Sequence, residues 1–238
     1  MGLLDLPAPL FERIDALLGV LPALLRLLLW GSVGGAISMW LYGVLSPQER
    51  IARSKREQLE VRRRLDGFDG ELAEAWPMIR RLLGLSLGHL GRVIGPALLA
   101  ALPVILLLVW ISNAYGYRFP EREPPPLQVQ PEELRAAWIA SPEGPPQVEV
   151  RDSRRELLAR VPVAVPVPVI EKRRWWNTLI GNPAGYLGAD ARVDRVSIEL
   201  PRQQVIGFGP DWMRGWEVPF FAAVLVASLI LKRALRLE

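Results

Sequence analysis

The chain lacks the residues on which most catalytic and metal sites depend. It contains no cysteine and a single histidine, His89. Disulfide bonds and thiolate chemistry are therefore excluded, and one histidine without partner ligands does not make a zinc site. No nucleophile elbow or metalloprotease motif is present, and the glycine-containing segment 182–188 lacks the lysine and hydroxyl of a phosphate-binding loop. We expect a protein that is not an enzyme and that uses no cofactor or metal.

Charged residues are missing from the two longest apolar runs, Leu27–Leu45 and Val93–Ser112. Each run approaches the roughly 20 residues that a helix needs to cross a bilayer. Without an intramembrane carboxylate, a proton relay or an intramembrane aspartyl protease is not expected. A third run, Val218–Leu231, is shorter, but Trp216 and Lys232 at its ends extend it by interfacial anchoring and snorkelling. The sequence thus predicts an α-helical integral membrane protein with three transmembrane helices, at residues 26–46, 92–116 and within 216–238.

Basic residues predict the orientation of these helices. The segment after the first run is rich in arginine and lysine, and its expected basic face consists of Arg53, Lys55, Arg56, Arg62, Arg63 and Arg64. The tail after the third run is also basic. The positive-inside rule places both on the cytoplasmic side of the inner membrane. The net charge of +4 then reflects topology rather than nucleic-acid binding. The only nucleic acid expected near the chain is that of a ribosome.

The N-terminus does not resemble a secretory signal, because Asp5 stands where a basic region belongs and no small-residue cleavage site follows. Residues 6–25 instead mix apolar positions with charges. This pattern favours an amphipathic helix within residues 1–25, which lies at the interface on the outer side of the inner membrane.

Residues 47–91, between the first two apolar runs, form the most informative segment. The run Asp66–Gly70 contains two glycines and two aspartates, which are typical of a turn. Before and across it, residues recur at the a and d spacing of a heptad, which predicts a helix with one mostly apolar seam. These positions are Ile51, Ser54, Gln58, Val61, Leu65, Phe68, Leu72 and Ala75. We expect a cytoplasmic helical hairpin that leaves the membrane, turns and returns.

Residues 117–215 are expected to form a small β-rich domain on the outer side. Alternation at Val148 and Val150, and again over Val193–Leu200, predicts strands. The run Val161–Val169 is β-branched but contains three prolines, so it suits an edge strand or an extended segment.

Three further segments of this domain carry weaker patterns. Pro120–Pro131 is expected to be an extended linker, and Glu132–Ile139 one or two turns of helix. Gln203–Phe208 is expected to pair with the strand that precedes it.

Tryptophans flank the parts of this domain that adjoin the apolar runs; they are Trp175, Trp176, Trp212 and Trp216. Indole rings favour the headgroup region. We predict that these residues are interfacial anchors that contact lipid or substrate. The alternative is that they form a plain interfacial belt or belong to the domain core.

Two local sequences carry a resemblance to a known family. Leu45–Arg50 followed by Lys55–Leu59 resembles the exit from the first core span into the hairpin of the YidC/Oxa-type membrane protein insertases. Gly95–Val104, which includes Pro103, resembles the glycine- and proline-bearing start of their next span. Together with the order of elements, which is similar to that of the three-span relatives, the resemblance covers about residues 6–115, and the last span by position only.

The resemblance implies a function. Family members help short or weakly hydrophobic segments into the bilayer without ATP, through a polar groove open to the cytoplasm. It implies nascent or unassembled membrane proteins and the lipid bilayer as partners, and a candidate groove of Ser38, Ser112, Asn113 and Ser228, with Arg92 at its cytoplasmic rim. The alternative interpretation of such residues is helix packing, as for Gly31, Gly34 and Gly35.

The chain departs from this family at one important position. YidC-type members carry an arginine inside the first core span, where this chain has Met39 between Ser38 and Trp40. The uncharged spans and the additional outer domain leave a second hypothesis open. In that hypothesis the chain is a non-catalytic accessory or assembly subunit, bound to a fixed membrane-complex partner through the outer domain.

Overall fold

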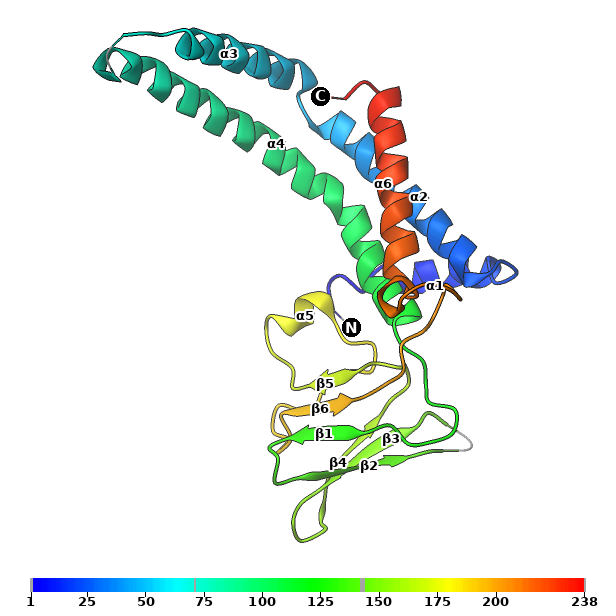
Figure 1. Cartoon of the computed structure of the whole chain (residues 1–238). Coiled ribbons are helices and arrows are strands. Elements are labelled where there is room, and N and C mark those ends of the chain that lie inside the picture. Colours follow the sequence, from blue (N-terminus) through cyan, green and yellow to red (C-terminus); the bar gives the residue numbers. More distant parts are fainter. Residues whose placement is uncertain (1, 71, 142–143, 238) are drawn as a thin grey trace. The chain divides into compact units, whose positions relative to one another are not determined.

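The structure is a computed structural model that describes residues 2–70, 72–141 and 144–237 (Figure 1). The chain divides into two compact units. One, which we call the β unit, comprises Met1–Leu27 and Leu106–Pro219, and the other, the helical unit, comprises Leu28–Ile105 and Phe220–Glu238.

The helical unit contains all of α3 (Gln48–Asp66) and most of three other helices. These are α2 (Ala23–Leu45), α4 (Leu72–Tyr115) and α6 (Glu217–Ala234). Two stretches, Ala23–Leu45 and Glu74–Tyr115, are long and apolar enough to span a membrane, and in each only 28% of the most apolar window is buried. A core helix of a soluble protein would be mostly buried, so this exposure favours contact with lipid. The third span predicted at α6 stays a prediction, since that helix is shorter and ends in Lys232 and Arg233.

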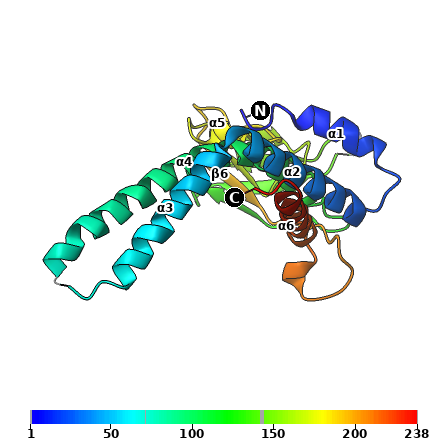
Figure 2. The ribbon, with the colours of Figure 1, turned by 90° about the horizontal axis from the view of Figure 1, so that it is seen from above.

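The predicted hairpin is present within the helical unit, where α3 runs back along α4 (Figures 1 and 2). Helix α3 ends at Asp66 and α4 begins at Leu72, so the predicted turn is confirmed. In the seam, Ile51, Ser54 and Val61 are buried. Phe68 lies in the connection between the helices and does not continue the seam, because the glycines on either side end the helix before it.

The returning arm of the hairpin and the second apolar run are one continuous helix. Helix α4 has 44 residues and contains Pro77, Pro96 and Pro103. The boundary expected between residues 91 and 92 is therefore a change in composition within one helix. The helix begins as an arm of the hairpin and continues as the apolar stretch.

Helices α2 and α6 approach each other closely at two glycines. A Cβ atom added at Gly31 would lie 2.5 Å from the carbonyl oxygen of Phe220, and one at Gly35 would lie 2.6 Å from that of Val224. Glycines four residues apart allow two helix backbones to approach in this way, as in membrane helix pairs. The predicted packing role of Gly31 and Gly35 is confirmed.

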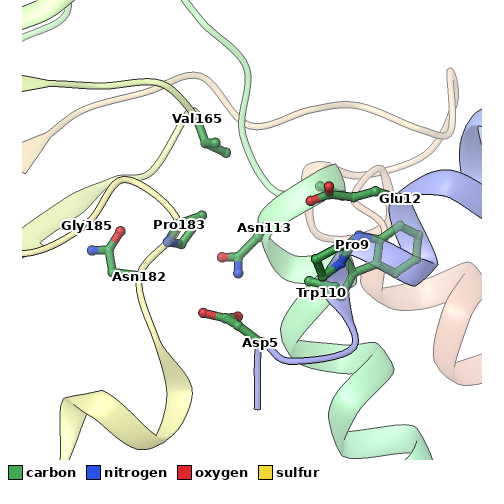
Figure 3. A pocket seen from close by; sticks show the side chains of 11 residues that line it. Asp5, Pro9, Glu12, Trp110, Asn113, Val165, Asn182, Pro183 and Gly185 are labelled. Atoms are coloured by element: carbon green, nitrogen blue, oxygen red, sulfur yellow. The ribbon is translucent and has the colours of Figure 1, made fainter. Parts of the chain in front are cut away.

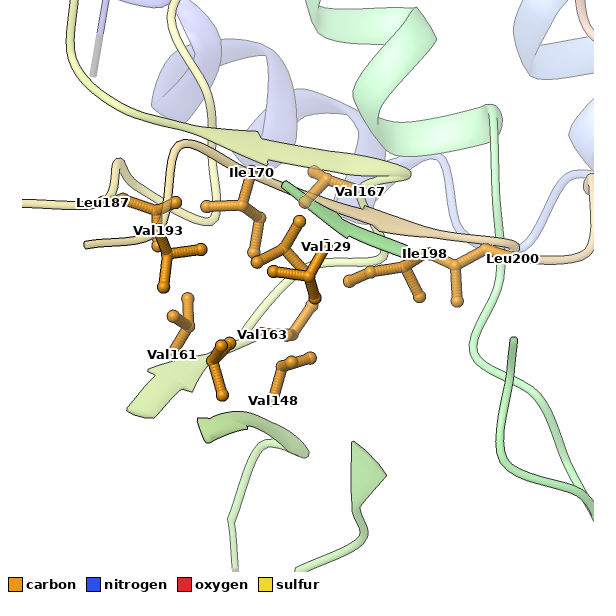
Figure 4. Close-up of a cluster of buried hydrophobic side chains, with 12 residues drawn as sticks. Val129, Val148, Val161, Val163, Val167, Ile170, Leu187, Val193, Ile198 and Leu200 are labelled. Carbon is orange, nitrogen blue, oxygen red and sulfur yellow. The ribbon is translucent and has the colours of Figure 1, made fainter. Parts of the chain in front are cut away.

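The β unit contains two antiparallel three-stranded sheets. One has the order β1 (Leu127–Gln130), β6 (Arg195–Ile198), β5 (Val169–Glu171), and the other has the order β2 (Arg135–Ile139), β3 (Gln147–Arg151), β4 (Leu157–Pro162). Alternate side chains of both sheets enter one apolar cluster (Figure 4). Its members are Val129, Val148, Val150, Val161, Val163, Val167, Ile170, Leu187, Val193, Val196, Ile198 and Leu200.

The opposite face of β3 carries a buried carboxylate. Glu149 accepts hydrogen bonds from Arg151 at 2.8 Å and from Arg160, its cross-strand neighbour on β4, at 2.7 Å. The hydrogen bonds from Arg151 and Arg160 hold the pKa of Glu149 below its usual value of 4.5. This ion-pair cluster joins β3 to the edge strand β4.

Predictions for the β unit have mixed outcomes. Strands at Val148–Val150 and within Val193–Leu200 are confirmed, and the proline-broken run supplies only the ends of edge strands β4 and β5. The short helix expected at Glu132–Ile139 is wrong: Arg135–Ile139 is strand β2, because Ala136 and Trp138 pack against the core. The expected linker Pro120–Pro131 contains β1.

The partners of β6 also differ from expectation. Gln203–Phe208 was expected to pair with it, but β1 and β5 occupy its two sides. A central strand has only two edges, so the later segment has no edge left to join.

The remaining helices are short. Helix α1 (Ala8–Leu17) is amphipathic as predicted but ends at Leu17, before Gly19 and Pro22. Helix α5 (Asn177–Ile180) is tied to the N-terminal segment, because the amides of Leu3 and Leu4 donate to the carbonyls of Thr178 and Leu179. A single 3-10 turn, η1, covers Asp211–Met213.

Candidate functional site

The hairpin forms a cleft between its two arms. Its cavity of about 290 Å³ is lined by Lys55, Gln58, Leu59 and Arg62 of α3 and by Leu82 and Ser86 of α4. Residues three, four and seven positions apart lie on one face of a helix, which is why these α3 side chains share the cleft. The side-chain amide of Gln58 donates to the carbonyl of Leu85 at 3.0 Å and fixes the register of the two arms.

The chemistry of this hairpin cleft is amphipathic. Leu59 and Leu82 form an apolar surface between the arms, while Lys55 and Arg62 supply positive charge from α3. An apolar groove with a basic margin suits a helix or extended segment that carries apolar side chains and acidic ones. These lining residues offer apolar contact and positive charge, and Lys55 and Arg62 are the only ionisable groups among the described residues of the cleft.

The structure divides the predicted basic face. Lys55 and Arg62 line the hairpin cleft, whereas Arg64 forms an ion pair with Glu60 on the same helix. The other three, Arg53, Arg56 and Arg63, are exposed and do not line the cleft. The apolar members Leu59 and Leu82 were missed, because no sequence pattern on one arm gives the register of the other.

The five candidate groove residues lie in different settings. Ser38, Ser228 and Arg92 belong to the helical unit, and Ser112 and Asn113 to the β unit. The guanidinium of Arg92 donates to Ser54 at 3.3 Å and so joins the arms of the hairpin. The predicted groove as a whole stays a prediction.

The three serine hydroxyls among these residues differ in their contacts. Ser228 Oγ lies 3.1 Å from the place of a Cβ atom on Gly35, so it packs against α2. Ser112 donates to the carbonyl of Val109 in its own helix at 2.8 Å. The hydroxyl of Ser38, by contrast, is buried and has no hydrogen-bond partner among the described residues.

A polar network that the sequence did not reveal lies in the β unit. Arg26 pairs with Asp15 at 2.6 Å, and the hydroxyl of Tyr115 donates to the two carboxylate oxygens of Asp15 at 2.7 and 2.8 Å. The guanidinium also lies 5.5 Å from the centre of the Tyr115 ring. The charge of Arg26 is thus paired within the protein. The network joins α1 to the first turn of α2 and the last turn of α4.

Comparison with known proteins gives no match to a family model, a curated protein or a solved structure. The function is therefore argued from the geometry of the chain. No cluster of three His, Cys, Asp or Glu side chains suited to a metal occurs in residues 2–70, 72–141 and 144–237.

The predicted interfacial tryptophans separate into two kinds. Trp175 is 83% exposed, and Trp176 and Trp212 are also exposed, as an interfacial anchor requires. Trp216 is buried and packs within the protein. This burial fits the alternative role of Trp216 in the domain core, and its indole lies near Gly116.

Proposed function

We propose that this protein is a membrane protein insertase or chaperone of the YidC/Oxa superfamily, which helps short or weakly hydrophobic segments enter the bilayer without ATP. The observation that carries the proposal is the hairpin cleft, a basic and apolar site on a helical hairpin that connects α2 to the apolar stretch of α4. The hairpin lies in the cytoplasm, as its arginines indicate, and the β unit lies on the outer side of the inner membrane.

In this mechanism the hairpin receives the substrate before the membrane does. Leu59 and Leu82 cover the apolar side chains of an arriving segment, while Lys55 and Arg62 attract its acidic residues. A charged residue at the centre of a membrane helix costs about 2.5–3.5 kcal/mol on translocon scales. A binding site next to the spans raises the local concentration of the segment, and polar groups within the spans lower this cost.

Helix α6 completes the proposed set of three spans. Its close contact with Gly31 and Gly35 of α2 is the kind of packing found between membrane helices. Lys232 and Arg233 in its last turn then lie on the same side as the hairpin, in accord with the positive-inside rule. The buried hydroxyl of Ser38, without a partner in the described residues, is the polar group of α2 best suited to a substrate.

The test compares two double substitutions on α3. Lys55→Gln with Arg62→Gln removes the two charges that line the cleft. Arg56→Gln with Arg63→Gln removes two charges at the same seven-residue spacing that do not line it. Insertion of a short membrane protein into liposomes without ATP is measured by protease protection of its translocated tail, at equal amounts of each variant.

We expect the first pair to lower insertion strongly and the second pair to leave it near the wild-type level. Equal loss in both pairs would mean that the hairpin acts only through its overall charge, and the cleft would be excluded as the substrate site. Insertion by the wild-type chain no faster than by empty liposomes would refute the insertase function itself.

A second candidate function, an accessory subunit of a larger membrane complex, is favoured by exposed aromatic residues on the β unit. Trp175, Phe208 and Trp212 are each at least 70% exposed. Such surface suits either the bilayer or a fixed protein partner. This candidate predicts that one partner co-purifies in fixed ratio and is lost when the three aromatics are replaced by serine. Purification of the wild-type chain as a lone monomer in mild detergent would exclude it.

A further inference from the structure

A cavity of about 300 Å³ lies entirely within the β unit (Figure 3). Its walls come from the N-terminal segment, α1, the last turns of α4 and the loop around Asn182. Two carboxylates and one free amide line it together with an apolar surface; the residues used below are Asp5, Glu12, Trp110, Asn113, Val165 and Pro183. We call it the headgroup cavity.

Asp5 is the decisive residue of the headgroup cavity. It is 5% exposed, and one of its carboxylate oxygens accepts a hydrogen bond from the backbone amide of Gly2 at 3.1 Å. No ion pair joins it to a basic side chain in residues 2–70, 72–141 and 144–237. A buried carboxylate that has no cation among these residues is costly, which favours a positively charged ligand.

The backbone beside Asp5 is shaped to admit its carboxylate. Gly181 has φ of +86°, and a Cβ atom at that position would collide with an oxygen of Asp5. Any other residue at 181 would be strained and would displace the carboxylate. The close approach therefore holds Asp5 in place at the wall of the cavity.

The other polar groups complete the recognition of a cation. Glu12 lines the cavity and makes no ion pair with another described residue. Asn113 points into the same space as Asp5 and has no hydrogen bond to another described side chain or backbone group (Figure 3). Asn113 also lies in the last turn of α4, whose carbonyl groups and dipole favour positive charge. Asn182, in contrast, is occupied by Val169 and Ala184.

The geometry points to a primary ammonium group as the ligand, supplied by the headgroup of an aminophospholipid. An ammonium has three N–H donors, which match the carboxylates of Asp5 and Glu12 and the amide oxygen of Asn113. The indole of Trp110, with Val165 and Pro183, provides an aromatic and apolar wall that suits the carbon atoms next to the charge. The cavity lies at the end of the apolar run of α4, where a spanning helix meets the headgroups. The inference depends on α4 spanning the membrane and not on the insertase function.

The test is native mass spectrometry of the full chain, released from membranes into mild detergent with equal amounts of phosphatidylethanolamine, phosphatidylglycerol and phosphatidylcholine. We expect phosphatidylethanolamine to be retained in preference to the other two. Glu12→Gln should weaken its retention about 2- to 5-fold, the range of an exposed ion pair. Asp5→Asn should weaken it roughly 10-fold or more, as for a lost bond to a buried charge. Glu133→Gln, an exposed carboxylate elsewhere in the β unit, is the matched control.

Several outcomes would overturn this inference. Equal retention of the three lipids would do so, as would unchanged retention in Glu12→Gln. The Glu12→Gln variant keeps the test decisive even if Asp5→Asn does not fold, because Glu12 is exposed and its replacement leaves folding intact. Displacement of the lipid by millimolar free ethanolamine would support the ammonium site but assign it to a soluble amine. Displacement by a lysine-bearing peptide and not by ethanolamine would assign it to a protein ligand and refute the lipid.

Discussion

Removing one hydroxyl should loosen α1 from the rest of the β unit. Tyr115 donates to both oxygens of Asp15, and the side chain of Asp15 is only 14% exposed. Helix α1 has no buried residue of its own, and this hydrogen bond, the Arg26 pair and the ring contact between Phe11 and Trp110 at 5.5 Å help to attach it. Tyr115→Phe removes the first of these and leaves the aromatic ring in place.

The free energy lost on Tyr115→Phe depends on the negative charge of the acceptor, Asp15. A hydrogen bond to a charged group contributes about 1.5–3 kcal/mol. Arg26 still compensates Asp15 after the substitution, so the lower part of this range applies. A loss of about 1.4 kcal/mol corresponds to a tenfold change in the equilibrium between attached and detached α1. The amide protons of α1 exchange with solvent through that opening.

The assay is hydrogen exchange of α1 in lipid nanodiscs, followed by mass spectrometry. We expect Tyr115→Phe to speed the exchange of α1 amides roughly 10-fold or more while leaving the sheets unchanged. Tyr117→Phe is the matched control, because the Tyr117 hydroxyl makes no hydrogen bond to another described residue. Exchange in α1 that differs less than about twofold between the two variants would refute the role of this network.

Three further substitutions test the packing and the electrostatics. Gly35→Ala places a Cβ atom 2.6 Å from the Val224 carbonyl and should cost about 1–3 kcal/mol of unfolding free energy in detergent; an unchanged value would exclude the contact between α2 and α6. Gly84→Ala meets no atom within 4 Å and should gain about 0.5–1 kcal/mol, so that a loss would show the site to be covered. Glu149→Gln should destabilise the chain at pH 7. Because the pKa of Glu149 lies below 4.5 in the folded state, its contribution is present above that value and is lost as pH falls through the folded pKa. The difference from wild type should then narrow in acid, and a constant difference would contradict the ion-pair account.

The sequence was most informative where one physical rule dominates. Uncharged runs predicted the two apolar helices, and paired glycines and aspartates predicted the turn of the hairpin, because neither depends on distant residues. Gly31 and Gly35 were correctly expected to pack helices, since small residues four apart serve little else in an apolar helix.

Failures occurred where distant residues decide the outcome. Arg135–Ile139 has no strong preference of its own and becomes a strand because it pairs with β3 and covers the core with Trp138. The network of Asp15, Arg26 and Tyr115 joins residues far apart in sequence, and nothing local marks them as partners. The same holds for Asp5, which reads as an ordinary surface acid until Gly181 is brought against it.

The prolines of α4 supply polarity that its side chains do not. In a helix the amide of residue i donates to the carbonyl four residues earlier, and proline has no amide proton to donate. Pro96 and Pro103 therefore leave the carbonyls of Arg92 and Leu99 without that donor, the second within a run that has no charged residue. In hydrocarbon such an oxygen needs another donor, from water or a neighbouring helix. Helix α4 thus carries hydrogen-bond acceptors built from backbone alone, in a run where the sequence offers almost no polar side chain.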